Sequence, residues 1–252
     1  MKIILCLLAL ILVPCLAPAA DESAPELLEL IESVQSSAVG LDRLMKEIRD
    51  GRAGGAAART PLIRLLDEAA RQYYRSGGGD APRSSWVFPV AGRDVRAITG
   101  GRRHGYRAQG YDFFSGNRHG GHPSLDIFIR DRDQDCSDDG TGEPVSVLSM
   151  TAGVVISAEQ LWEQGSRLRG GNYLWVYDPG SGLLVYYAHN QRLLVRVGDL
   201  VRPGDVIATV GRSGWNAAKR RSPTHLHLTV IDAAGGRFTP VDVYRDLRAL
   251  SR

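Results

Sequence analysis

The 252-residue sequence predicts a mainly β fold, in which an antiparallel β-sheet domain follows an α-helical N-terminal appendage. From Trp86 onward glycine is frequent and the apolar runs are short and β-branched, which is typical of strands joined by turns. Before Trp86 the apolar residues recur at the spacing of an amphipathic helix. These two patterns divide the chain into a helical appendage with its linker at 20–84 and a β domain at 85–252.

Two or three helices are expected in the segment 20–84. Apolar residues at helical spacing predict one amphipathic helix, or a pair broken at Gly40: Leu27, Leu30, Ile31, Val34, Leu41, Leu44, Met45 and Ile48. After a glycine-rich connector, Thr60 and Pro61 have the form of an N-cap and a first helical residue, and the second helix should end at Gly77. We expect a hairpin packed on the β domain, or a spacer. The alternative is a cap over a functional site or a docking handle for a partner.

The β domain contains several strand-like runs bounded by glycine turns, which are 145–157, 172–177, 183–187 and 195–210. Strands separated by such turns indicate hairpins of an antiparallel sheet. The last run contains the near-repeat Val-Gly-Asp-Leu-Val and Pro-Gly-Asp-Val-Ile. A similar hairpin occurs in lipoyl and biotinyl carriers, which present a modified lysine at a turn. No lysine lies between Lys46 and Lys219, which argues against a carrier.

The N-terminus has the features of a secretory signal peptide at 1–19. Lys2 gives a positive start, residues 3–16 are apolar apart from Pro14, and residues 17–19 have the small-x-small pattern that signal peptidase accepts. The apolar run is too short for a comfortable membrane span. We therefore expect an exported protein, periplasmic or secreted, with no transmembrane segment after cleavage.

Cysteine usage and charge narrow the functional classes. Of the three cysteines, Cys6 and Cys15 lie in the expected leader, so Cys136 remains alone and no internal disulfide is possible. A lipoprotein would need acylation of Cys15, and Pro14 directly before it argues against this. The 31 Lys and Arg residues barely exceed the 28 Asp and Glu residues. This balance gives no case for a nucleic-acid partner and is compatible with an anionic cell-envelope substrate.

Histidines and a carboxylate recur at spacings that suit a metal site. His225 and His227 are two apart in a predicted strand, so they share one face while Leu226 points into the core. His122 and Asp126 are also an even number of positions apart. An imidazole pair and an imidazole–carboxylate pair can build a three-ligand zinc site and leave one histidine free for catalysis.

Three motifs together resemble the lysostaphin-type, or LytM-type, zinc metallopeptidases of peptidase family M23. The motifs are His122-Pro-Ser-Leu-Asp126, Tyr187-Ala188-His189 and His225-Leu226-His227, in the order of the family, and the resemblance covers roughly residues 86–246. It implies a β-sandwich like that of lysostaphin and the glucose permeases. The family commonly has glycine where Ser124 stands, a difference that removes no ligand.

The resemblance also implies a role for each residue. His122, Asp126 and His227 would bind Zn²⁺, and the fourth position would hold a water made acidic by the metal. His189 and His225 would be the catalytic pair, one as general base and the other steadying the oxyanion or protonating the leaving amine, with the assignment between them open. The implied substrates are peptides of peptidoglycan, with a D-Ala-containing cross-link favoured. Tyr106 and Tyr111 are expected to be surface tyrosines, and a donor role for either is the alternative.

Two other functional hypotheses compete with the zinc endopeptidase. A LytM-like regulator binds and activates cell-wall amidases after losing its zinc ligands, whereas this chain retains every predicted ligand. A D-Ala-D-Ala carboxypeptidase would place a glutamate base ahead of its last histidine, and no Glu follows Glu163. The zinc endopeptidase is therefore favoured, with the regulator as the alternative.

An acidic insertion follows the first predicted metal motif. Asp131, Asp133 and Asp135 have the spacing of a calcium loop, but Cys136 stands where glycine is expected and no bidentate glutamate stands at position 12 of the loop. We therefore expect a solvated loop, open to a role in facing the substrate, rather than a calcium site. Cys136 is expected to be a bystander, and no role is assigned to His104 or His119.

Overall fold

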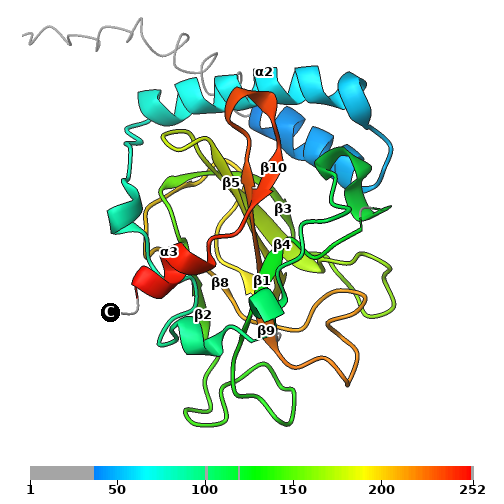
Figure 1. The fold of residues 1–252 in the computed structure, drawn as a ribbon, viewed down its shortest axis with the longest axis vertical. Helices are drawn as coiled ribbons and strands as arrows, with labels where there is room; N and C mark the ends of the chain where they lie inside the picture. Colours follow the sequence, from blue (N-terminus) through cyan, green and yellow to red (C-terminus); the bar gives the residue numbers. More distant parts are fainter. Residues whose placement is uncertain (1–36, 100–101, 119, 251–252) are drawn as a thin grey trace, which may run out of the picture.

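The computed structural model describes residues 37–99, 102–118 and 120–250 (Figure 1). The predicted signal peptide at 1–19, the first part of the predicted appendage and His119 lie outside the described residues. Within those ranges, no helix is both long enough and apolar enough to cross a membrane.

Two antiparallel sheets form the body of the protein, which confirms the predicted fold class. The seven-stranded sheet has the order β1-β9-β5-β4-β3-β7, with β10 also paired to β9. Its strands are β1 (Ser124–Phe128), β3 (Gly153–Glu159), β4 (Asn172–Asp178), β5 (Leu183–Asn190), β7 (Leu200–Val201), β9 (His225–Asp232) and β10 (Thr239–Val241). The three-stranded sheet has the order β2-β8-β6 and contains β2 (Ser146–Leu148), β6 (Arg192–Leu193) and β8 (Val206–Thr209).

The main core lies between the two sheets. Alternate residues of β9, Leu226, Leu228 and Val230, are buried there together with Ile207 and Ala208 of the small sheet. Because successive strand residues point to opposite faces, the residues between them in β9 face away from the small sheet. The outer face of the large sheet is therefore a second surface with its own composition.

Two helices cover part of this outer face (Figure 1). One occupies residues 37–49 at the start of the described chain, and the other is α2 (Gly55–Arg75). A second apolar core joins the helices to the sheet, and it includes Leu41, Met45, Ile48, Leu62 and Leu66 of the helices with Val154, Ile156, Leu184 and Ile231 of the strands. The described part of the segment 20–84 is thus a helical pair packed on the β domain.

The start of α2 differs from the sequence prediction. The helix begins at Gly55, so Thr60 and Pro61 lie inside it and the prediction that they cap it is wrong. Alanine has the highest helix propensity, and the run at 56–58 extends the helix ahead of Pro61, whose missing N–H costs one hydrogen bond. The predicted end is close to the observed one, because Gly77 follows in a left-handed conformation with φ of 84°. The first helix continues through Gly40 without a break.

The near-repeat at 197–207 does not form the expected hairpin. Its two halves lead into β7, which pairs with β3 of the large sheet, and β8, which pairs with β2 and β6 of the small sheet. What repeats is the turn. Asp199 accepts the N–H of Arg196 and Asp205 accepts that of Arg202, both at 2.7 Å. The repeated sequence therefore builds two equal turns whose strands belong to different sheets.

Short elements complete the described fold. Helix α3 (Tyr244–Ala249) buries Leu247 beside the main core. The 3-10 turns are η1 (Arg83–Ser85), η2 (Val95–Ala97), η3 (Arg102–Gly105), η4 (Phe113–Arg118) and η5 (Ala234–Gly236). Of these, η4 lies where the outer face of the large sheet meets the helices, since Phe113 and Phe114 belong to the second core.

Candidate metal centre and cleft

Three neighbouring strands position the predicted site residues. Asp126 of β1 lies directly opposite His227 of β9, and His227 lies opposite Ala188 of β5. Leu226 is fully buried in the main core, so His225 and His227 on either side of it face the outer surface of the sheet, as the alternation predicts. Pairing of β1 with β9 thus brings the carboxylate and both histidines to one face.

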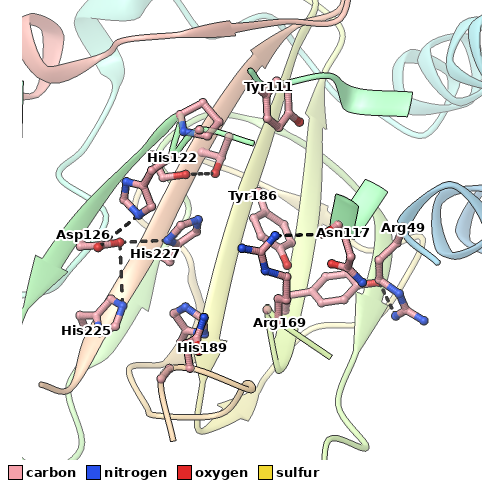
Figure 2. A pocket seen from close by; sticks show the side chains of 18 of the residues that line it. Arg49, Tyr111, Asn117, His122, Asp126, Arg169, Tyr186, His189, His225 and His227 are labelled. Atoms are coloured by element: carbon pink, nitrogen blue, oxygen red, sulfur yellow. Dashed lines mark hydrogen bonds and ion pairs between the residues drawn. The ribbon is translucent and has the colours of Figure 1, made fainter. Parts of the chain in front are cut away.

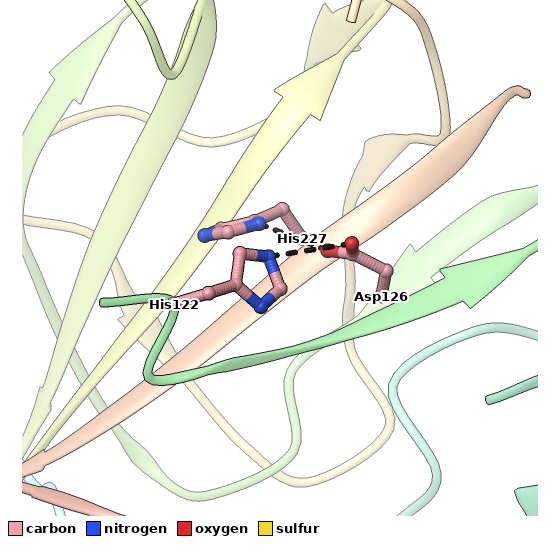
Figure 3. Close-up of side chains that lie close together, drawn as sticks. All are labelled: His122, Asp126 and His227. Carbon is pink, nitrogen blue, oxygen red and sulfur yellow. Dashed lines mark hydrogen bonds and ion pairs between the residues drawn. The ribbon is translucent and has the colours of Figure 1, made fainter. Parts of the chain in front are cut away.

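His122, Asp126 and His227 form one group whose potential ligand atoms all lie within 4.8 Å of one another (Figure 3). His227 Nδ1 is 2.9 Å from Asp126 Oδ1, and His122 Nε2 is 3.3 Å from Asp126 Oδ2. An antiparallel bridge to Arg107 holds the backbone of His122 beside β1. We call these three residues the ligand cluster. Two imidazoles and one carboxylate are a donor set that suits zinc.

The charges of the ligand cluster support the same fit. Burial favours the neutral carboxyl of Asp126, but the hydrogen bonds from His122 and His227 outweigh it and hold its pKa well below the ordinary value. The hydrogen bond to Asp126 in turn raises the pKa of His122. Asp126 therefore stays ionised between two imidazole nitrogens. Where a divalent cation binds, it would replace the protons that these three groups otherwise share.

Main-chain carbonyls fix three of the imidazoles. A carbonyl only accepts, so each Nδ1 carries the hydrogen. The Nε2 atom of each ring is then the one turned to other groups, and in His122 it faces Asp126 Oδ2. The pairs are His122 with Gly105 at 3.1 Å, His189 with Ser213 at 2.8 Å and His225 with Pro223 at 2.7 Å. In His227 the Nδ1 atom instead faces Asp126. The nitrogens that face Asp126 are therefore different in the two histidines, Nε2 in His122 and Nδ1 in His227.

His189 reaches the outer face through an unusual backbone. Tyr187 is fully buried in the main core, so strict alternation would send residue 189 to the same inner side. His189 has a φ of 65°, a left-handed conformation that reverses the alternation. Its ring then lies 4.9 Å from that of His225 and 5.4 Å from that of His227. Gly214 packs against this ring, since a Cβ there would lie 2.9 Å from His189 Nδ1.

Burial favours the neutral form of both predicted catalytic histidines. Burial lowers the pKa of His189 well below its ordinary value, and the neighbouring imidazoles of His225 and His227 lower it further. Burial also lowers the pKa of His225, although Asp126 opposes the change. A neutral imidazole with a free Nε2 can accept a proton, so either residue has the state that a general base needs.

A cleft of about 610 Å³ contains the ligand cluster and both of these histidines (Figure 2). Sequence reasoning missed several residues that line it: Met45, Ile48, Arg49, Asn117, Arg169, Tyr186 and Arg221. The outward position of Tyr186 could have been predicted, because successive strand residues point to opposite faces and its neighbour Tyr187 is buried. A cap over a functional site was one alternative for the segment 20–84, but its sequence did not indicate which residues of the helix at 37–49 would line the cleft.

The two tyrosines before the first motif are not free surface residues, contrary to expectation. Tyr111 lines the cleft, and Tyr106 packs against the main core. His104, which carried no predicted role, stacks on Tyr244 with ring centroids 3.4 Å apart. Only Tyr111 of these residues is in a position to contact a bound substrate.

The acidic loop is held by hydrogen bonds within itself and to the segment before β9, and it does not line the cleft. Asp131 accepts N–H groups from Asp135 and Cys136, and it accepts the hydroxyl of Thr224 at 2.6 Å just before β9. Asp131, Asp133 and Asp139 lie close enough to hold an ion, but they are not the three residues of the calcium-loop spacing. Burial raises the pKa of the Cys136 thiol, which suits an unreactive bystander.

The model of peptidase family M23 matches residues 137–240. The match covers less than half of the chain, and it confirms the resemblance drawn from the motifs. The match includes His189, His225 and His227 and begins after His122 and Asp126. The family assignment therefore rests on the later two motifs, and β1 adds the first by its pairing with β9.

Curated relatives match only a part of their own length. The chain is 32% identical over 140 residues to the murein hydrolase activator EnvC of Escherichia coli, which is 56% of this chain and 26% of that protein. It is 37% identical over 78 residues to a lipoprotein NlpD/LppB homolog of Pseudomonas aeruginosa, which is 31% of this chain and 24% of that protein. The chain spans about a quarter of the length of these relatives.

Solved structures with a related fold include two peptidases. A zinc-containing peptidase from Vibrio cholerae is 24% identical with a TM-score of 0.40, over 65% of this chain and 39% of that chain. The catalytic domain of lysostaphin from Staphylococcus simulans is 23% identical with a TM-score of 0.39, over 57% of this chain and 90% of that chain.

Proposed function

We propose that this protein is an exported zinc-dependent endopeptidase that hydrolyses peptide bonds in the stem peptides or cross-links of peptidoglycan. The observation that carries the proposal is the meeting of the ligand cluster with two further neutral histidines in one cleft. A structural metal site would need neither of those histidines. The family of the region supports an action on peptidoglycan, and the leader expected at 1–19 supports export to the periplasm or beyond.

The residues of the chain would divide the work as follows. His122, Asp126 and His227 would hold zinc, which when bound supplies an acidic water and polarises a carbonyl. His189 and His225 line the same cleft with Nδ1 held by main-chain carbonyls, so through Nε2 one would take a proton from the nucleophile and the other would stabilise the oxyanion or protonate the leaving amine. The wall formed by Ile48 and Tyr186 would restrict water around the peptide.

Two measurements on the mature full chain test this function. Zinc content should reach one ion per chain, and mass analysis should find peptide fragments with new amino termini after incubation with purified peptidoglycan. The bond cut is read from the fragment masses. Bound zinc with no released peptide would refute the enzymatic proposal while leaving the metal site intact.

A regulator of cell-wall amidases is the second candidate. The similarity to a protein named murein hydrolase activator favours it. A regulator would raise the rate of a purified peptidoglycan amidase, and His189→Ala would activate that amidase as well as the unaltered protein does. An endopeptidase would leave the amidase rate unchanged and would depend on His189.

A further inference from the structure

The cleft carries an excess of positive charge. Among the described residues that line it, the only carboxylate is Asp126, which belongs to the ligand cluster. Three arginines line the same cleft, namely Arg49, Arg169 and Arg221. Their value for binding depends on whether neighbouring acidic groups already neutralise them.

Arg49 is already neutralised. Its guanidinium contacts both carboxylate oxygens of Asp50, at 2.7 and 3.0 Å, and lies 3.2 Å from Glu159. It also donates to the hydroxyl of Tyr173 at 2.9 Å. These contacts fasten the end of the helix at 37–49 to β3 and β4. Arg49 is thus a structural anchor with little charge to offer a ligand.

Arg169 has no acidic partner among the described residues, and its position over the cleft is fixed by a hydrogen bond. Its side chain is exposed and donates to the main-chain carbonyl of Asn117 at 2.9 Å (Figure 2). Within the described residues it forms no ion pair with an acidic side chain. Guanidinium has five N–H donors, so this one bond fixes its place and leaves most donors for a ligand. The next residue, Gly170, accepts the backbone N–H of His189 at 2.9 Å, which ties Arg169 to the reaction centre.

Arg221 lies beside the other predicted catalytic histidine. It is exposed, lines the cleft, and stands two residues before Pro223, whose carbonyl orients His225. No acidic partner is found for its side chain in the described part of the chain. The rings of His189 and His225 are 4.9 Å apart, so an uncompensated arginine accompanies each member of the pair.

We propose that Arg169 and Arg221 are carboxylate-binding residues of the cleft, so that the cleft selects peptides that carry a free carboxylate near the bond presented to the ligand cluster. Arginine binds carboxylates through two parallel N–H bonds, and conversion to an amide removes the charge and one acceptor. The identity of the ligand as a stem peptide rests on the proposed function, but selection between carboxylate and amide does not require hydrolysis.

The test is a binding measurement with zinc-loaded full chain in which His189→Ala blocks turnover. The probes are fluorescein-labelled L-alanyl-D-isoglutamyl-L-lysyl-D-alanine and the same peptide with both of its backbone carboxylates amidated. Fluorescence anisotropy at low salt should give about tenfold tighter binding of the carboxylate peptide, which is the scale of one charge-assisted hydrogen-bond pair. Singly amidated peptides then show which carboxylate is read.

Matched arginine variants assign the selection to the two residues. Arg169→Gln with Arg221→Gln should remove the preference, whereas Arg167→Gln with Arg220→Gln makes the same charge change in exposed neighbours outside the cleft lining and should retain it. Equal binding of both peptides by the parent chain, or a preference that survives in the first double variant, overturns the proposal. Peptidoglycan hydrolysis is measured separately on chains that retain His189. Absence of hydrolysis would contradict the proposed function, whereas absence of the carboxylate preference would contradict only the role of the two arginines.

Discussion

The outer face of the large sheet has two ends, both formed by the same strands. One end is covered by helices and apolar, and the other is open and bears ionisable side chains. At one end, Leu184 of β5 and Ile231 of β9 are fully buried under the helices. At the other end, His227 of β9 lies in register with Asp126 of β1 and Ala188 of β5, and both His227 and Asp126 border an open cleft. Alternation decides only that these residues face outward. Residue type then decides whether a helix covers them.

The comparison separates stability from chemistry. The covered end removes apolar side chains from water and so stabilises the fold. The open end holds ionisable groups, whose burial without partners would be unfavourable. Ile48 belongs to the second core and also lines the cleft, so the helix at 37–49 marks the boundary between the two ends. Variants at each end should therefore alter one property and spare the other.

The largest effect is expected from Asp126→Ala at the open end. This change removes the carboxylate that contacts both His122 and His227. Zinc affinity should fall by more than about 100-fold, since loss of an outer-shell partner alone costs 10- to 100-fold. Peptide release from peptidoglycan should be lost with it. Zinc content after dialysis reports on the open end, and the circular dichroism spectrum reports on the fold and its covered end. Full zinc occupancy would exclude Asp126 as a ligand.

His189→Ala should keep the metal and lose turnover. Removing a general acid or base costs about 10²- to 10⁴-fold in rate, and His189 makes no contact that the ligand cluster needs. The control is His104→Ala, which removes a histidine stacked on Tyr244 outside the cleft lining. Near-normal turnover in the His189 variant would make the catalytic assignment wrong.

Leu62→Ala tests the covered end. Leu62 is fully buried in the core between α2 and the sheet, so its truncation should lower the free energy of unfolding by about 2–5 kcal/mol. Zinc content and turnover at 25 °C should stay unchanged. Leu226→Ala is the matched truncation in the main core, and its position between His225 and His227 should add a loss of zinc affinity. Equal effects of both variants on zinc would mean that the two ends are not separable.

The smallest effect is expected from Asp131→Asn in the acidic loop. Burial acts to raise the pKa of Asp131, but hydrogen bonds from Thr224 and from the backbone of Cys136 lower it below the ordinary value. A lowered pKa in the folded state adds stability that is present above the ordinary carboxyl pKa and is lost as pH falls through the folded value. Urea unfolding should show a loss of about 1 kcal/mol at pH 7. The difference should vanish in acid, and a pH-independent difference would contradict the charge-based explanation.

The sequence predicts the open end better than the covered end. Strict alternation placed His225, His227 and Leu226, because the two-residue period of a strand leaves no other choice. The position of His189 followed from its motif alone, since its left-handed backbone depends on Ser213 and Gly214 from a distant loop. Local periodicity contains no information about such a loop.

The covered end shows what periodicity leaves out. The apolar stripe of the first helix indicated that one face would be buried, but not that it would lie on the face that bears the site. The arginines of the cleft were also hidden, because an exposed Arg169 looks like any surface residue until the carbonyl of Asn117 is brought to it. Contacts between segments far apart in the chain decided each of these features.

The pairing of β9 between β1 and β5 also sets when the protein can acquire its chemistry. Asp126 and His227 are 101 residues apart, and β9 is the last long strand in chain order. During synthesis β1 and β5 are made well before β9, the strand that pairs between them. The edges of β1 and β5 that pair with β9 therefore stay unpaired until β9 is made. We therefore expect the ligand cluster to assemble in the final stage of folding, and an incomplete chain that ends before His225 to lack the zinc affinity proposed for the full chain.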